Sequence, residues 1–310
     1  MQRHEAWRLA YRLDRYLRSA DVGSLERRGQ DINLAMMNVN ATGQLTAPTS
    51  LSEIYWWELF THVLEELELR SIDYRSVNLV DVDAMRWISA PAAPRGLEIL
   101  GKRTLPSADF LSRVGQREHI KGSFEKGRFR IAPASSYSDP SLNPAIQDEE
   151  LTVTAIGSGD TAIVTTYDPK TGKSGKPIPV VGEISYSQST PDNFFVLCMS
   201  NGYQPRILDD FEADALLVVH NVNRFLIRLE RAVKAMRPDL RMLARPITYY
   251  DPYRVNPDRA DPEFSKHFRF SYQREYRIIW QKIGLGFDEE PFFVEIGNLK
   301  EIASIYLCSS

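Results

Sequence analysis

The last two thirds of the chain consist mainly of short segments that alternate apolar and polar residues or are rich in β-branched and aromatic residues. Runs of this kind, separated by turn residues, are typical of strands. Among them, only residues 117–127 and 222–236 have the spacing of helices. Many strands with few helices between them predict an α+β domain with a mixed or mostly antiparallel sheet. We expect the strands at residues 109–115, 128–133, 150–157, 162–168, 177–187, 193–200, 245–252, 275–281, 292–297 and 302–308.

The first hundred residues have a different texture, which favours helices. Residues 5–19 place aromatic and leucine side chains among arginines at mostly helical spacing. Residues 49–70 begin with a capping box formed by Ser50 and Glu53, after which apolar residues recur every three or four positions. We expect this second helix to bury one side of its surface. The residues expected inside are Trp56 or Trp57, Leu64 and Leu67.

A domain boundary is predicted near the end of this helical part. Residues 76–85 alternate like a strand, and the proline-containing stretch 88–109 has the composition of a connection. After this stretch the residue pattern changes from helical spacing to strand-like segments. We therefore expect a helical N-terminal segment over residues 1–100 and a catalytic or ligand-binding α+β domain over residues 101–310.

Composition excludes several classes of protein. The net charge is −3 and the pI about 6.0, so the chain has no global basic field for nucleic acid, although its clustered arginines leave room for a local patch. The two cysteines, Cys198 and Cys308, form no CxxC pair and indicate neither a disulfide framework nor a zinc site. The amphipathic N-terminus has no apolar signal region, and no apolar run approaches the length of a membrane span. We expect a cytoplasmic protein with no membrane contact.

Familiar catalytic signatures are missing from the sequence. It has no GxGxxG, no HExxH and no GxSxG, and its "GSGDT" lacks the lysine of a phosphate loop. The five histidines are scattered along the chain. Candidate sites must therefore come from less common patterns.

The first such pattern is the polar loop that follows the strand predicted at residues 128–133. Asp139 and Asn143 either hold the loop by bonding to its backbone or belong to a binding surface. The acidic run after them, together with Asp139, leaves a metal-dependent nuclease as a weaker alternative. Three adjacent acids do not all face one point on a regular element, so we predict no metal site. The run comprises Asp148, Glu149 and Glu150.

The second pattern is the aromatic and arginine-rich stretch "KHFRFSYQREYRIIWQ" at residues 266–281. If residues 268–280 are extended, their period of two puts Gln273, Glu275 and Arg277 on one face. This face is either a solvated surface with a loose ion pair or the wall of a cleft. In a cleft, the neighbouring arginines would keep the carboxylate ionised.

Several motifs also resemble a broad bacterial family of uncharacterised proteins. They are "FEKGRFRIAPASSYSDPSLNPAI", "FFVLCMS", "FSYQREYRIIW" and "LKEIASIYL", in this order, and the resemblance covers roughly residues 108–308. "SDP" stands where the family usually has "NDP", and "REYR" replaces part of "EKEYR".

The layout of these motifs is distantly similar to the ADP-ribosyltransferase fold of DNA-modifying toxins. This resemblance implies NAD as a co-substrate. Arg113 on a first strand and the hydroxyls of Ser135, Ser136 and Tyr137 would hold it. It also implies that Glu275, on a late strand, is the catalytic carboxylate. Gln273 stands where arginine-directed enzymes have a second acid, which argues against arginine as the target.

Two hypotheses of different kinds follow. The first is an NAD-dependent ADP-ribosyltransferase of the toxin or phage-defence type that acts on a nucleic acid or a protein. The alternative is a non-enzymatic ligand-sensing or interaction module with the same fold. For the first, we predict that Glu275 is partly buried on a concave surface, within side-chain reach of Arg113 or Tyr137.

Overall fold

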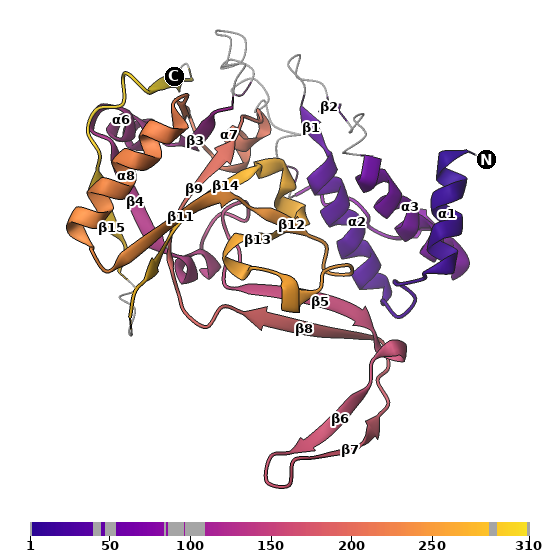
Figure 1. Ribbon diagram of the computed structural model, residues 1–310. Helices are drawn as coiled ribbons and strands as arrows, with labels where there is room; N and C mark the ends of the chain where they lie inside the picture. The colour runs from indigo at the N-terminus through magenta and orange to yellow at the C-terminus, as the bar shows by residue number, and fades with distance from the viewer. Residues whose placement is uncertain are drawn as a thin grey trace.

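The computed structural model describes residues 2–39, 45–46, 54–83, 85, 96, 109–284 and 290–308. Helices at the N-terminus lie beside an α+β part built on one large sheet (Figure 1). The predicted α+β class is confirmed. Of the described helices, none is long and apolar enough to cross a membrane.

The large sheet is antiparallel throughout its main path, whose strand order is β11-β14-β9-β3-β10-β16. Strand β4 joins it by pairing with β9, and β15 pairs with the other edge of β4. The bounds are β3 Leu111–Gly115, β4 Arg128–Pro133, β9 Phe195–Asn201, β10 Ala215–Val219, β11 Leu240–Pro246, β14 Glu275–Lys282, β15 Phe292–Glu295 and β16 Ala303–Leu307.

The sheet forks along one edge of β9. At the start of β9, Phe195 and Val196 pair with β4, whereas at its end Ser200 and Asn201 pair with β3. The three residues between these pairs, 197–199, form ladder pairs only with β14 on the opposite edge. The fork therefore opens a gap between β3 and β4 in the middle of the domain.

Helix α8 (Val222–Met236) packs on one face of this sheet and coincides with the helix predicted at residues 222–236. Its buried side chains are Phe225, Leu229 and Val233, which join the same core as Leu197 of β9 and Trp280 of β14. Helix α6 (Arg117–Lys126) adds Ile120 to this core, and the short α7 (Arg206–Asp210) follows β9. The period-two alternation of the strands supplies the apolar face that these helices cover.

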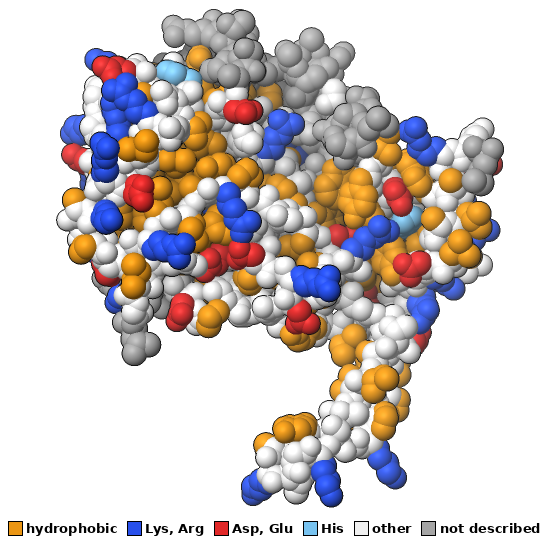
Figure 2. Space-filling model, viewed as in Figure 1, with side chains coloured by type: hydrophobic (Ala, Val, Ile, Leu, Met, Phe, Trp, Pro, Cys, Tyr) orange, Lys and Arg blue, Asp and Glu red, His pale blue; other side chains and the backbone are white. Residues whose placement is uncertain are grey.

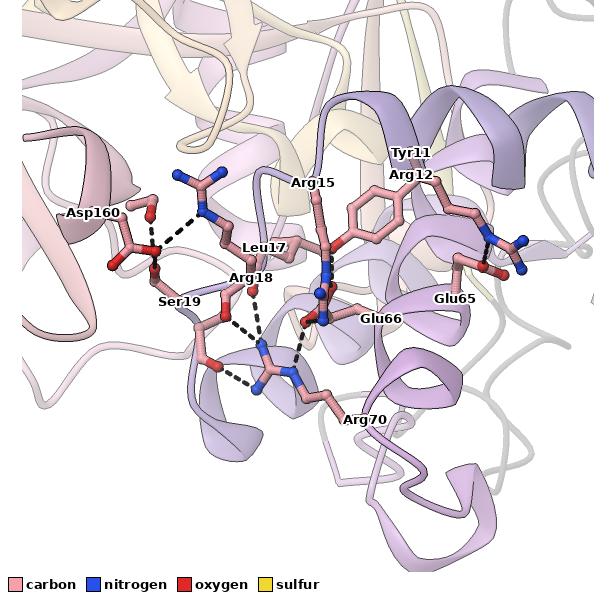
Figure 3. A network of polar contacts seen from close by, with 12 residues as sticks. Tyr11, Arg12, Arg15, Leu17, Arg18, Ser19, Glu65, Glu66, Arg70 and Asp160 are labelled. Carbon is pink, nitrogen blue, oxygen red and sulfur yellow. Dashed lines mark hydrogen bonds and ion pairs between the residues drawn. The ribbon is translucent and has the colours of Figure 1, made fainter.

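The N-terminal helices are α1 (Arg3–Leu13), α2 (Val22–Met36) and α3 (Ile54–Leu69). Two fully buried glutamates of α3 connect this helix to α1 and to the residues that follow α1, as Figure 3 shows. Glu66 accepts hydrogen bonds from Arg15, Arg70 and the hydroxyl of Tyr11, and Glu65 pairs with Arg12. Buried carboxylates are tolerated here because each has cationic partners. Leu67 is buried as expected, whereas Trp56 and Leu64 are only partly buried.

Buried arginines join this helical layer to the α+β part. Arg28 of α2 makes a bidentate ion pair with Asp251, with both N–O distances at 2.8 Å. Arg206 of α7 donates to the carbonyl oxygens of Leu34 and Met37 at the end of α2. Arg18 also reaches Asp160, at the root of the hairpins described next (Figure 3).

Two consecutive hairpin ribbons leave the sheet after the polar loop and form an arm (Figure 1). Strands β5 (Thr152–Ser158) and β8 (Glu183–Ser189) form the inner ribbon. Strands β6 (Val164–Asp168) and β7 (Lys173–Ile178) form the outer ribbon, which projects away from the body. The remaining short elements are β1 Asn38–Val39, β2 Leu45–Thr46, β12 Thr248–Tyr250, β13 Ser265–His267 and the 3₁₀ turns η1 Tyr74–Ser76, η2 Ala134–Ser138, η3 Gly159–Thr161, η4 Pro257–Arg259, η5 Pro262–Phe264 and η6 Phe268–Gln273.

Several sequence-based expectations were wrong or incomplete. Residues 76–83 and 85 form no strand. Residues 268–273 are a 3₁₀ segment and not a strand, because Arg274 adopts a left-handed conformation, with φ of 46°, that turns the chain into β14. The sequence reading did not predict α2 or β10, and β11 begins five residues before the strand expected at 245–252. The Ser50–Glu53 capping box and the boundary near residue 100 lie outside the described residues.

Candidate functional site

The gap between β3 and β4 widens into a cleft with a volume of about 540 Å³. This size is within the range of small-molecule sites. Side chains of different chemistry meet on its walls. The apolar lining includes Val114, Leu142, Ile146, Ile207 and Phe211, and the polar lining includes Ser112, Arg113, Arg130, Ser136, Tyr137, Ser200, Gln273 and Glu275.

Arg113 lies at the fork itself. Its Nη1 donates a hydrogen bond to the carbonyl oxygen of Cys198 over 3.0 Å. Residue 198 lies in the part of β9 that has no ladder partner on the β3/β4 edge, so the arginine side chain satisfies a backbone acceptor that a strand would otherwise bond. One guanidinium nitrogen is used in this way, and a guanidinium has five N–H donors.

The three predicted hydroxyl residues follow β4, in the turn η2, and the structure separates their roles. Ser136 and Tyr137 line the cleft, but Ser135 does not. The hydroxyl of Ser135 accepts a hydrogen bond from Asn193 Nδ2 at 2.7 Å and so fixes the turn to the start of β9. Ser136 Oγ donates to Pro133 O, also at 2.7 Å. Burial raises the pKa of Tyr137, which therefore stays a neutral phenol.

Glu275 is the first residue of β14 and also lines the cleft. It is only 5% exposed, and its two carboxylate oxygens are bonded to different cations. Lys266 Nζ donates to Oε2 at 2.8 Å, and Arg277 Nε donates to Oε1 at 2.7 Å. Burial alone would raise the pKa of Glu275, but Lys266 and Arg277 lower it to about 2. The carboxylate is therefore ionised at neutral pH.

Two further acids complete this buried charge cluster. Glu150 pairs with Arg277, and Asp148 and Glu150 each lie 3.5 Å from Lys266 Nζ. Two cations thus face three carboxyl groups. Burial raises the pKa of Glu150 to about 7, against the effect of Arg277 and Lys266. A proton on Glu150 would leave the cluster neutral, which is the less costly state for buried charges.

The predicted partial burial of Glu275 was therefore wrong, because its two cationic partners allow an ionised carboxylate to be almost fully enclosed. The alternative of an open, solvated face was wrong as well. The Arg277 pairing that this alternative named is present, but both partners are buried. The side-chain hydrogen bonds assigned to Glu275 go to Lys266 and Arg277, so Arg113 and Tyr137 share the cleft with it without a direct bond.

The loop over residues 139–148 closes one side of the cleft. Asp139 accepts from the backbone N–H of Ser141, and Asn143 accepts from that of Ala145, so both hold the loop, as the first of the two alternatives predicted. Asp139 also lines the cleft. Gln273 Nε2 donates to Ala145 O at 2.7 Å and ties the loop to the segment before β14. Gln273 is therefore a tether for the loop.

Metal binding finds no support in this region. Among the described residues, no group of three or more His, Cys, Asp or Glu side chains could hold a metal ion. Asp148 and Glu150 face Lys266, and Glu149 accepts from the backbone N–H of Leu151. The acids proposed for a nuclease are thus engaged with protein groups.

Sequence reasoning placed Arg277 beside Glu275 but missed Lys266 and the second acid, Glu150. Lys266 stands at the beginning of the aromatic stretch, nine residues before Glu275, and a short parallel pairing of β12 with β13 brings it back. Glu150 was considered only as part of an acidic run. Arg130, which lines the cleft from β4, lies within the first of the quoted motifs but was assigned no role.

Comparisons of the chain with protein-family models, with curated proteins and with solved structures gave no match.

Proposed function

We propose that the cleft binds NAD and that the protein is an ADP-ribosyltransferase acting on a macromolecular target. The observation that carries this proposal is the common lining of one cleft by Arg113, Tyr137 and Glu275, from three separate segments of the chain. Arg113 and Arg130 supply positive charge for a diphosphate. The apolar lining suits the faces of a base, and an ionised carboxylate stands at the start of β14.

The reaction requires little of the protein beyond positioning and charge. The bond between nicotinamide and C1′ of the ribose breaks, and nicotinamide leaves with the bonding electron pair. C1′ then bonds to a nucleophile of the target, which releases a proton. Positive charge develops on the ribose between these events, and the carboxylate of Glu275 stabilises it electrostatically. The low pKa of Glu275 keeps this carboxylate ionised at neutral pH.

Incubation of the purified protein with NAD labelled in its adenylate part, together with DNA and cell extract, tests the proposal. We expect label on a macromolecule and release of free nicotinamide. The Arg113→Met variant should lose both. Arg117→Met is the matched control, because Arg117 also donates to a backbone carbonyl, that of Cys308, but does not line the cleft. Absence of labelling and of nicotinamide release with the wild-type protein would end the proposal.

A ligand-sensing module is the second candidate, and a specific observation favours it. Both oxygens of Glu275 already accept hydrogen bonds from buried cations, as expected of a structural carboxylate. Under this reading NAD, or another anionic nucleotide, binds without turnover. Isothermal titration of NAD alongside the nicotinamide assay separates the two, because binding without release supports the sensor.

A further inference from the structure

The outer ribbon, formed by β6 and β7 and called the arm from here on, has the features of a surface for a binding partner. Every residue from 165 to 179 is exposed, so the outer ribbon packs on no other described part of the protein. Figures 1 and 2 show it projecting from the body as a narrow ribbon. Two isolated strands are at best marginally stable in water without an external surface. Its orientation is fixed at the root, where Arg18 bonds to Asp160 and Ser19 bonds to Ser158.

The end of the arm is basic, in contrast to the rest of the chain. It carries Lys170, Lys173 and Lys176, whereas the protein as a whole has a net charge of −3. Figure 2 shows these positive side chains spread around the end of the ribbon. None of the three forms an ion pair with any residue in the described part of the chain.

The nearby acid, Asp168, offsets only part of this charge, because one carboxylate stands beside three lysines. Asp168 accepts hydrogen bonds from the backbone N–H of Lys170 at 2.9 Å and from Thr171 Oγ1 at 2.8 Å. It therefore shapes the turn between the strands. The lysine side chains remain available to an anionic partner.

We propose that this arm binds duplex DNA, with its basic end directed at the phosphates beside the major groove. A two-stranded ribbon has dimensions that the major groove admits. Lysine, serine and threonine side chains and backbone N–H groups are the usual phosphate contacts, and the turn supplies all of them. The cores of protein–protein interfaces are depleted in lysine, so this composition favours a phosphate backbone over a protein surface.

This inference supplies a target class for the activity proposed above, and it depends on that proposal only for what happens to the DNA after binding. Binding needs neither NAD nor turnover. A failure of the arm hypothesis would leave the transferase proposal standing with another target, and a failure of the transferase assay would not affect DNA binding.

The test measures binding of the full chain to a fluorescently labelled DNA duplex by anisotropy over a range of salt concentrations. The test variant replaces the three arm lysines, Lys170, Lys173 and Lys176, with alanine. The matched control replaces Lys121, Lys234 and Lys300, which are exposed elsewhere and give the same change in net charge. We expect the arm variant to bind at least about tenfold more weakly at low salt. The slope of log K against log salt concentration should become less steep by roughly 0.9 for each lost phosphate contact. The control should bind like the wild type.

Three outcomes would overturn the proposal. One is undetectable binding of the wild type at low salt, and another is an equal loss in both variants. The third is equal affinity for an RNA duplex of the same sequence, because the major groove of A-form RNA is too narrow for a ribbon. Sedimentation of the protein without DNA tests whether the partner is a second copy of the same chain. A dimer that the arm variant abolishes would assign the arm to a second copy of the protein.

Discussion

Arg113 of β3 donates a hydrogen bond from Nη1 to the carbonyl oxygen of Cys198 on β9, over 3.0 Å, at the point where β3 and β4 part. The same side chain lines the cleft that the fork opens. One residue thus satisfies the backbone at the opening and places positive charge inside it. A stability contribution and a ligand-binding role are therefore expected from the same guanidinium.

Replacement of Arg113 by methionine should lower the free energy of unfolding by about 1–3 kcal/mol, because the Cys198 carbonyl loses its donor while the apolar stem is kept. Urea denaturation measures this change. Titration with NAD should also show weaker binding by the variant. A loss of stability with unchanged NAD affinity would mean that Arg113 serves only the fork.

Glu275→Gln should lower stability by about 1–3 kcal/mol, since the change weakens the charged hydrogen bonds from Lys266 and Arg277. Glu150 and Asp148 still compensate the two cations. The variant is therefore a poor test of catalysis unless its folding is measured first. A double-mutant cycle with Lys266→Met isolates the pair. The double variant should lose clearly less stability than the sum of the single changes. Additive losses would contradict the ion pair.

Glu150 should make stability depend on pH near neutrality. Because burial raises its pKa to about 7 from an ordinary 4.5, the folded protein holds this proton more tightly than the unfolded chain between these values. The resulting stability is present below about pH 4.5 and is lost as the pH rises to about 7. The stability of the wild type relative to Glu150→Gln should therefore fall between pH 5 and pH 8, as measured by urea denaturation at each pH. A stability difference between the two proteins that does not change with pH would mean that Glu150 does not have the raised pKa. The exposed Glu149→Gln change serves as the control.

Acid should reveal the opposite behaviour of Glu275. Its pKa is lowered to about 2, so the stability it contributes is present above about pH 4.5 and is lost as the pH falls toward 2. Over this acidic range the stability of the wild type should approach that of Glu275→Gln. A difference that persists at pH 2 would argue against the charged pairs with Lys266 and Arg277.

Two glycines of α6 should respond in opposite directions to alanine. Gly122 lies inside the helix, and an added Cβ would meet nothing within 4 Å, so Gly122→Ala should stabilise by up to about 1 kcal/mol. Gly127 ends the helix with φ of 65°, and its Cβ would fall against Ile296 and the backbone of Gly297. Gly127→Ala should therefore destabilise by more than about 1 kcal/mol. Thermal unfolding of both variants checks this, and equal effects would contradict the assigned helix end.

The alternation and spacing of apolar residues were sufficient to predict the α+β class, most strands of the large sheet and the full extent of α8, because these patterns depend on which side of a local element is buried. The motif positions also led to Arg113, Ser136, Tyr137 and Glu275, which share one cleft. Ser135 is a serine next to Ser136 in the same turn, yet it bonds to Asn193 and does not line the cleft. No local sequence pattern distinguishes the two serines.

The tertiary structure alone decided the electrostatic environment of the site. Arg277 follows Glu275 on the same strand, and their spacing predicted the pair, but Lys266 and Glu150 approach from distant segments. The sequence therefore contained no spacing that would predict a buried cluster or the opposite pKa shifts of its two glutamates. The fork likewise depends on which strands pair with each end of β9. Local residue preferences determine helices and strands, whereas the energies of buried charges depend on contacts between segments that are distant in the chain.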